Sequence, residues 1–157
     1  MTERRPFRFE KLEVWQSARA LARLVYSLTD SFPTREQFGL TSQIRRAAVS
    51  IGANIAEGSG KNSDRDFARF LEQAYGSAME TASLLQLAVD LGFLEDSNAS
   101  EALEKLQILS NQVAALNRSL GVQQQKTTIP NSVVAPADHR RPSTFAPRPS
   151  TCQSAQP

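Results

Sequence analysis

The sequence predicts an all-α protein, an antiparallel up-down four-helix bundle with a disordered C-terminal tail. Before Gly121, apolar residues recur at helical spacing in four stretches, and the alternation typical of strands is absent. Short links join the four stretches, which favours antiparallel packing of neighbouring helices. Six of the eight prolines follow Gly121. We therefore assign residues 8–121 to the bundle and residues 122–157 to the tail.

The tail is rich in Pro, Ser and Gln and shows neither a helical nor a strand period. Such a segment buries too little apolar surface to offset the entropy lost when a chain is ordered. We interpret it as a solvated, disordered tail. The alternative is a weak contact with RNA or with a partner protein, because Arg140 and Arg141 lie beside the only histidine, His139.

The first two helices are predicted before the Gly58-Ser59-Gly60 stop. The first covers residues 9–30, with an apolar seam in steps of four and three residues that comprises Val14, Ala18, Leu21, Val25 and Leu28. Phe32-Pro33 ends this helix, and proline also suits a first helical turn. The second helix is therefore predicted at residues 33–57, with a loosened turn near Gly39.

Two further helices are predicted between Ser63 and Gly121. The third begins at a capping-box-like Ser63-Asp64-Arg65-Asp66 and runs to Leu91, where Gly92 ends it. Its apolar face comprises Phe67, Phe70, Leu71, Ala74, Ala78, Ala82, Leu85 and Val89. A second capping box, Asn98-Ala99-Ser100-Glu101, opens the fourth helix. That helix has an apolar face of Leu103, Leu106, Leu109, Val113, Leu116 and Leu120.

Several functional classes find no support in the composition. The only cysteine, Cys152, cannot form an internal disulfide, which fits a reducing cytoplasm. No apolar run approaches the roughly 20 residues of a membrane span. The bundle has no histidine or cysteine to complete an acid–base or triad arrangement, and the E-x-x-H pairs of di-iron bundles are absent. Gly58-Ser59-Gly60-Lys61 follows a helix and lacks P-loop spacing. We expect a cytoplasmic, non-enzymatic protein without metal or cofactor.

The second predicted helix carries a polar stripe beside its apolar core face. At 100° per residue, the stripe comprises Gln43, Arg46, Ser50, Asn54 and Glu57. We interpret it as a structural hydrogen-bond network that fixes the register of neighbouring helices. A ligand or catalytic site is the alternative, although Glu57 is the only acid on the stripe.

A second apolar sector lies on the same helix, away from the core face, and comprises Phe38, Val49, Ala53 and Ala56. One wall of a monomeric bundle needs a single apolar sector. We therefore interpret the second sector as an interface with another subunit. The alternative is that both sectors flank one wide buried face inside the bundle.

The charge is unevenly distributed along the chain. Residues 1–69 hold twelve Lys and Arg against eight Asp and Glu, whereas residues 70–121 hold two against seven. The candidates for contact with nucleic acid are Arg19, Arg23, Arg45, Lys61, Arg65 and Arg69. Recognition of shape or backbone is expected, because no aromatic-rich RNA motif is present. Asp64 and Asp66 dilute this basic group.

These motifs resemble a known family. GLTSQIRRAAVSIGANIAEGSGKNS (39–63), EKLEVWQSARALARLVYSLTDSFP (10–33) and FLEQAYGSAMET (70–81) are similar to the signature of the four-helix-bundle proteins encoded in intervening sequences of bacterial 23S rRNA genes. The resemblance covers residues 7–121 and does not extend to the tail.

The resemblance implies an up-down bundle that assembles as a ring, a homopentamer. A related branch, the accessory protein of diversity-generating retroelements, engages a reverse transcriptase and RNA through a basic surface. Two functions are therefore open at this point. The first is a homo-oligomeric module that binds structured RNA or a nucleoprotein. The second is a scaffold for a protein partner such as a reverse transcriptase.

Overall fold

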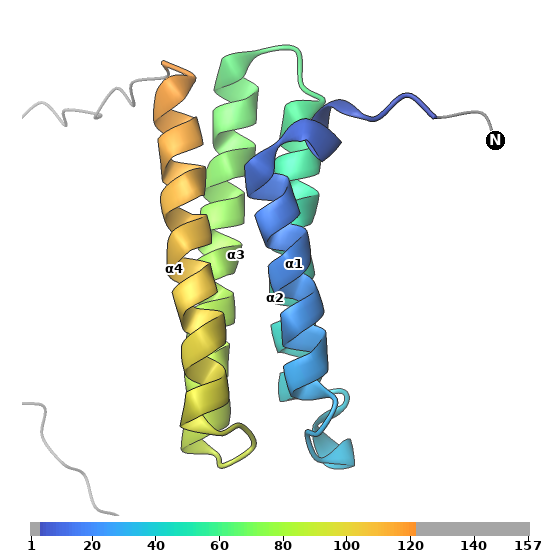
Figure 1. Ribbon diagram of the computed structural model, residues 1–157, viewed down its shortest axis with the longest axis vertical. Coiled ribbons are helices and arrows are strands. Elements are labelled where there is room, and N and C mark those ends of the chain that lie inside the picture. The colour runs from blue at the N-terminus through green and yellow to red at the C-terminus, as the bar shows by residue number, and fades with distance from the viewer. Residues whose placement is uncertain (1–3, 122–157) are drawn as a thin grey trace, which may run out of the picture. The chain divides into compact units, whose positions relative to one another are not determined.

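The computed structural model of the protein describes residues 4–121, and within this range it contains four long helices and no strand. The helices are α1 (Glu13–Thr29), α2 (Leu40–Ser59), α3 (Asp64–Asp90) and α4 (Asp96–Ser119). Successive helices run in opposite directions, so the predicted all-α up-down bundle is confirmed (Figure 1). The predicted disordered tail, residues 122–157, lies outside the described residues.

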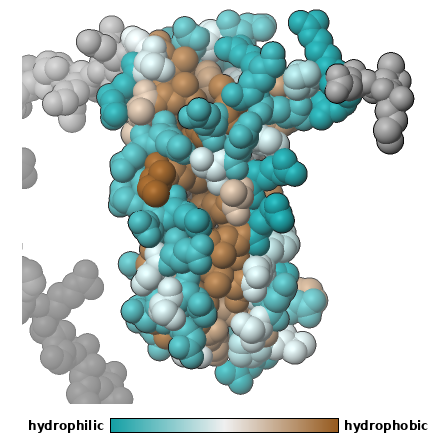
Figure 2. All heavy atoms as spheres, viewed as in Figure 1, coloured by the Kyte–Doolittle hydropathy of each residue, from teal (hydrophilic) through white to brown (hydrophobic). Residues whose placement is uncertain are grey.

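The core of the bundle is formed by the apolar face of each helix. The predicted seam of α1 is confirmed, since Val14, Ala18, Leu21 and Val25 are buried and Leu28 packs against them. The buried residues of α2 include Ile44, Ala48, Ile51 and Ile55. Those of α3 include Leu71, Ala74 and Leu85, and those of α4 include Leu106, Leu109 and Val113. Burial of each large aliphatic side chain contributes roughly 1.5–3 kcal/mol. Figure 2 shows that part of the apolar interior also reaches the surface along one face of the bundle.

The turn between α2 and α3 requires a close approach of the two helices. A Cβ atom at Gly58 would lie 2.7 Å from both Phe67 Cδ2 and Phe70 Cβ. Glycine removes this clash, and the aromatic rings of α3 can therefore close over the end of α2. Further along the pair, Ser50 Oγ and Ser77 Oγ form a hydrogen bond of 2.9 Å. The small residues of α2 thus set how closely it lies against α3.

The starts of the first two helices differ from the prediction. The second was expected from residue 33, but residues Thr34–Glu36 form a short 3-10 helix (η2) and α2 begins only at Leu40. Gly39 interrupts the helix with φ −99° and ψ −121°, and Glu36 Oε2 accepts a hydrogen bond from Leu40 N. The first helix also divides into a 3-10 helix, η1 (Arg8–Lys11), and α1, because Leu12 is extended.

Only one of the two predicted capping motifs acts as a cap. Ser63 Oγ accepts a hydrogen bond from Asp66 N at 3.1 Å, so the predicted start of α3 is confirmed. The predicted box at Asn98 was wrong, because α4 begins at Asp96 and Asn98 N already bonds to Glu95 O. Leu94 and Ala99 are buried, which fixes the register of this turn and places the acidic Asp96 in the first turn. Gly92 ends α3 with φ +70°, as expected of a glycine stop.

Candidate nucleic-acid interface and association surface

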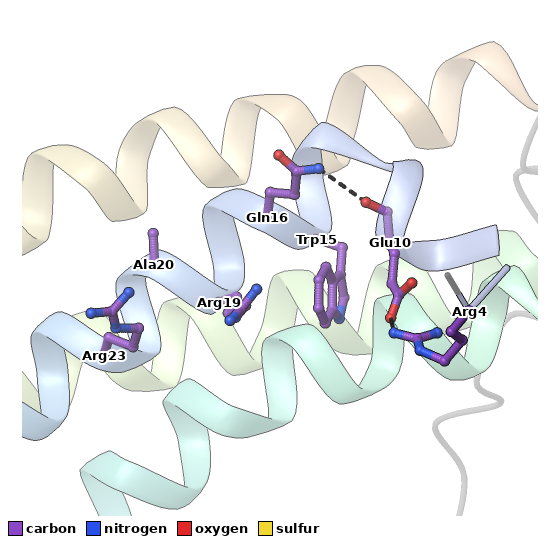
Figure 3. Close-up of a pocket in the computed structure, with 7 residues that line it drawn as sticks. All are labelled: Arg4, Glu10, Trp15, Gln16, Arg19, Ala20 and Arg23. Atoms are coloured by element: carbon purple, nitrogen blue, oxygen red, sulfur yellow. Dashed lines mark hydrogen bonds and ion pairs between the residues drawn. The ribbon is translucent and has the colours of Figure 1, made fainter. Parts of the chain in front are cut away.

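A basic groove of about 370 Å³ runs along the outer face of α1. Its lining residues come from α1 and from the N-terminal strap (residues 4–11), and they are Arg4, Glu10, Trp15, Gln16, Arg19, Ala20 and Arg23 (Figure 3). Three arginines against one carboxylate make this surface positive. We call it the α1 groove. Sequence reasoning found Arg19 and Arg23 but missed Arg4 and Trp15, because only the fold of the strap brings them to this place.

The strap is held against α1 by hydrogen bonds that converge on Glu10. Arg4 donates to Glu10 Oε1 at 2.6 Å, and Phe7 N donates to Oε2 at 3.0 Å. From α1, Gln16 Nε2 donates to the backbone oxygen of Glu10 at 3.0 Å. The hydrogen bond from Arg4 lowers the pKa of the Glu10 carboxyl, so this group stays ionised and holds the guanidinium at the end of the groove.

Aromatic rings connect the strap to the groove. The ring of Phe7 stacks on that of Phe9, with centroids 5.6 Å apart. The ring of Phe9 in turn meets Trp15 at 4.8 Å with a tilt of 57°. The guanidinium of Arg19 lies 5.9 Å from the Trp15 ring centroid. Arg19 thus has an aromatic partner in Trp15, and its charge also helps to lower the pKa of the nearby Glu10 carboxyl.

Arg19 and Arg23 are the free cations of α1. They are four residues apart, so their side chains lie one turn apart on the same exposed face. Within residues 4–121 neither forms an ion pair. A guanidinium that has no carboxylate partner can bind a phosphate without first breaking an existing bond.

The other predicted basic residues are more strongly engaged. Arg45 donates to Thr29 Oγ1 at 2.8 Å and to Asp30 Oδ1 at 2.7 Å, and its guanidinium lies 4.7 Å from the Tyr26 ring centroid. It therefore clamps α2 to the end of α1.

At the α2–α3 link, Lys61 pairs with Glu57 at 3.1 Å and Arg69 with Asp66 at 3.8 Å, while Arg65 is exposed. Sixteen positions separate Arg45 from Lys61, roughly 24 Å if the whole interval were α-helical. The six predicted residues thus do not form one surface.

The predicted polar stripe of α2 is only partly connected. Asn54 Nδ2 donates to the Ser50 backbone oxygen at 2.9 Å and to Ser50 Oγ at 3.1 Å. Through Ser50 this pair reaches Ser77 of α3, a partner that sequence reasoning missed. Glu57 instead pairs with Lys61, and in the described part of the chain Gln43 and Arg46 are exposed without a partner.

The second apolar sector predicted for the second helix lies on the surface, and its member Phe38 precedes α2, in a turn, rather than lying on the helix. The side chains of Phe38 and Val49 are 91% and 47% exposed, Ala53 is exposed and Ala56 is half-buried. The alternative of one wide buried face inside the bundle is therefore wrong. A groove of about 700 Å³ follows this surface, and Tyr26, Phe38, Arg46, Val49, Ala53 and Glu80 are among the residues that line it.

Residues 4–121 contain neither a candidate metal site nor a candidate membrane span. No group of three or more histidine, cysteine, aspartate or glutamate side chains is placed to hold a metal ion. None of the described helices is both long and apolar enough to cross a membrane.

The chain is similar to known proteins in both fold and sequence. A solved structure, described as a protein of unknown function from the S23 ribosomal protein family of Bacteroides thetaiotaomicron, has a similar fold with a TM-score of 0.61. It is 24% identical, and the alignment covers 67% of this chain and 95% of that one. No curated protein sequence matches the chain significantly. The family model described as "23S rRNA-intervening sequence protein" matches residues 10–115. Because this match spans α1 to α3 and most of α4, the chain belongs to the 23S rRNA-intervening sequence protein family.

Proposed function

We propose that the protein is a cytoplasmic, non-enzymatic, homo-oligomeric module that binds structured RNA through the α1 groove. The observation that carries this proposal is the convergence of Arg4, Arg19 and Arg23 on one surface, where only Glu10 opposes them. Arg4 already neutralises that carboxylate through its hydrogen bond. Arg19 and Arg23 remain available for contacts with RNA.

Assembly strengthens this small basic surface. The association surface is formed by the exposed Phe38, in the turn before α2, and by Val49 and Ala53 of α2, and the family resemblance implies a homopentameric ring. In a ring the α1 groove is repeated by the symmetry, so that several grooves act on one RNA. A charge that is modest per subunit then gives a substantial field and an avidity that one copy lacks.

The test is charge reversal on α1. We expect Arg19→Glu with Arg23→Glu to lower the affinity for a structured RNA by at least about tenfold, because two positive charges of the groove become negative. Binding of the native protein should weaken steeply as salt rises, and the variant should lose at least about one unit of that slope. Fluorescence anisotropy of a labelled RNA across a salt series measures both quantities.

The matched control reverses two charges on α4. Lys105 forms an exposed pair with Glu101, and Arg118 is exposed at the end of the helix. Lys105→Glu with Arg118→Glu changes the net charge by the same amount, so we expect much weaker effects on binding. Equal losses in both variants, or no RNA binding by the native protein at low salt, would contradict the proposal.

A second function is favoured by the exposure of Phe38. An aromatic side chain that is 91% exposed is suited to a protein partner, and a reverse transcriptase is the partner that the family resemblance suggests. In this case the protein is an interaction scaffold. Copurification of the protein with a reverse transcriptase from its host should then survive nuclease treatment and be lost on Phe38→Ser.

A further inference from the structure

We infer that the α1 groove holds one unpaired nucleotide of the bound RNA, with its base stacked at Trp15 and Arg19 and its phosphate beside Arg23. This inference rests on the proposed RNA binding and goes beyond it by naming the element that is recognised. The ligand is an unpaired nucleotide, as found in a loop, a bulge or a single strand, rather than a continuous duplex.

The indole of Trp15 is paired with the guanidinium of Arg19 in the groove. Unpaired bases stack on aromatic rings and on the planes of arginine side chains. Trp15 is half-buried and braced by Phe9 on one side, while Arg19 lies over its ring. The planar guanidinium of Arg19 is thereby held near Trp15, among the residues that line the groove. A base inside a duplex is stacked on its neighbours and cannot reach such a surface.

The groove has the size of a small-ligand site. Its volume, about 370 Å³, lies at the small end of the range of roughly 300–1,000 Å³ that is typical of small-ligand sites. Recognition of double-stranded RNA by shape uses contacts spread over about 16 base pairs. A short groove between a strap and a single helix is suited to one nucleotide.

The charge differs between the two ends of the groove. The Glu10 carboxylate lies at the strap end, and its lowered pKa keeps it ionised. Arg4 pairs with this carboxylate, but the negative charge still makes the strap end of the groove less favourable for a phosphate than the end at Arg23. Arg23 lies two turns along α1 from Gln16 and has no ion-pair partner in the described structure. The phosphate is therefore placed at Arg23, and the base points back toward Trp15.

Trp15 is the only tryptophan of the chain, so its fluorescence reports on the groove directly. The experiment titrates the full-length protein with an eight-nucleotide single-stranded oligoadenylate and with a blunt RNA duplex of the same length. We expect saturable quenching of Trp15 by the single strand and at least about tenfold weaker binding of the duplex.

Two charge-preserving variants separate stacking from simple charge. Arg19→Lys keeps the positive charge but removes the flat guanidinium, so single-strand affinity should fall roughly five- to tenfold with an unchanged salt slope. Arg23→Lys keeps a phosphate contact and should bind within about twofold of the native protein. Circular dichroism and molar mass confirm that both variants keep the native fold and assembly.

The outcomes distinguish the two proposals. Salt-sensitive RNA binding without quenching of Trp15, equal affinity for single strand and duplex, or native affinity of Arg19→Lys each overturn the unpaired-nucleotide site and leave RNA binding in place. Failure of both RNAs, and of a structured RNA, to bind at low salt overturns the proposed function itself.

Discussion

At the scale of single residues, the tightest steric constraint is found at Gly58. The residue lies on the inner side of the α2–α3 turn, where two aromatic side chains of α3 leave no room for a methyl group. Gly76, in the middle of α3, is the opposite case, because nothing lies within 4 Å of its hypothetical Cβ. The same residue type is therefore required at one position and merely tolerated at the other.

This contrast predicts opposite effects of one substitution. Gly58→Ala should lower the free energy of unfolding by about 1–2 kcal/mol, since overpacking outweighs the gain in helix propensity. Gly76→Ala should raise it by roughly 0.5–1 kcal/mol, because alanine restricts the unfolded chain and fits the helix. Urea unfolding monitored by circular dichroism compares the two. A stabilising Gly58→Ala would show that the turn relaxes more easily than its contacts indicate.

At the scale of the elements, helix starts are set by hydrogen bonds that a sequence motif only suggests. Ser63 and Asn98 both look like N-caps, yet only Ser63 accepts a hydrogen bond from a backbone N–H of its first turn. Asn98 lies inside α4, which has already begun at Asp96. The two residues should therefore differ in how much their side chains stabilise the helices.

Replacement of each residue by alanine tests this difference. Ser63→Ala removes the acceptor for Asp66 N and should cost about 1 kcal/mol of unfolding free energy. Asn98→Ala removes no cap and should change it by less than about 0.5 kcal/mol. Thermal and urea unfolding give both values. If Asn98→Ala were as costly as Ser63→Ala, α4 would begin at Asn98 in solution.

At the scale of the whole molecule, the distribution of exposed apolar side chains points to association. Val49 on α2 and Ile108 on α4 are 47% and 52% exposed, so both add apolar surface. They differ in their surroundings, because Val49 lies in the 700 Å³ groove beside Phe38 and Ala53. We assign association to the α2 surface rather than to α4.

Molar mass measured by light scattering tests this assignment. The native protein should elute as a multiple of 17.3 kDa, five copies for the ring that the resemblance implies. Val49→Lys should dissociate the assembly into folded monomers, because it places a charge in an apolar interface. Ile108→Lys, with a similar exposure, should leave the mass unchanged. A monomeric native protein would refute the association surface.

Much of the fold was predictable because helical periodicity is local. The core residues of α1 and α2 follow directly from the spacing of apolar side chains, and Gly92 marks the end of α3 by its own backbone preference. The start of α2 was not predictable in this way. Glu36 and Gly39 act on the first turn through a side-chain hydrogen bond and a non-helical backbone conformation.

The candidate site also combines features that the sequence predicts with features that only the tertiary structure decides. The residue types and helical positions of Arg19, Arg23 and Arg45 were readable from the sequence. The tertiary structure decided that Arg45 clamps α2 to Thr29 and Asp30, whereas Arg19 and Arg23 stay free.

Arg4 joins them only because Glu10 holds the strap against α1. By itself, the sequence determined the four helices, their core faces and the family. Which charges remain available for the proposed RNA contact was decided by contacts between residues far apart in the chain, and such contacts leave no local periodic signal.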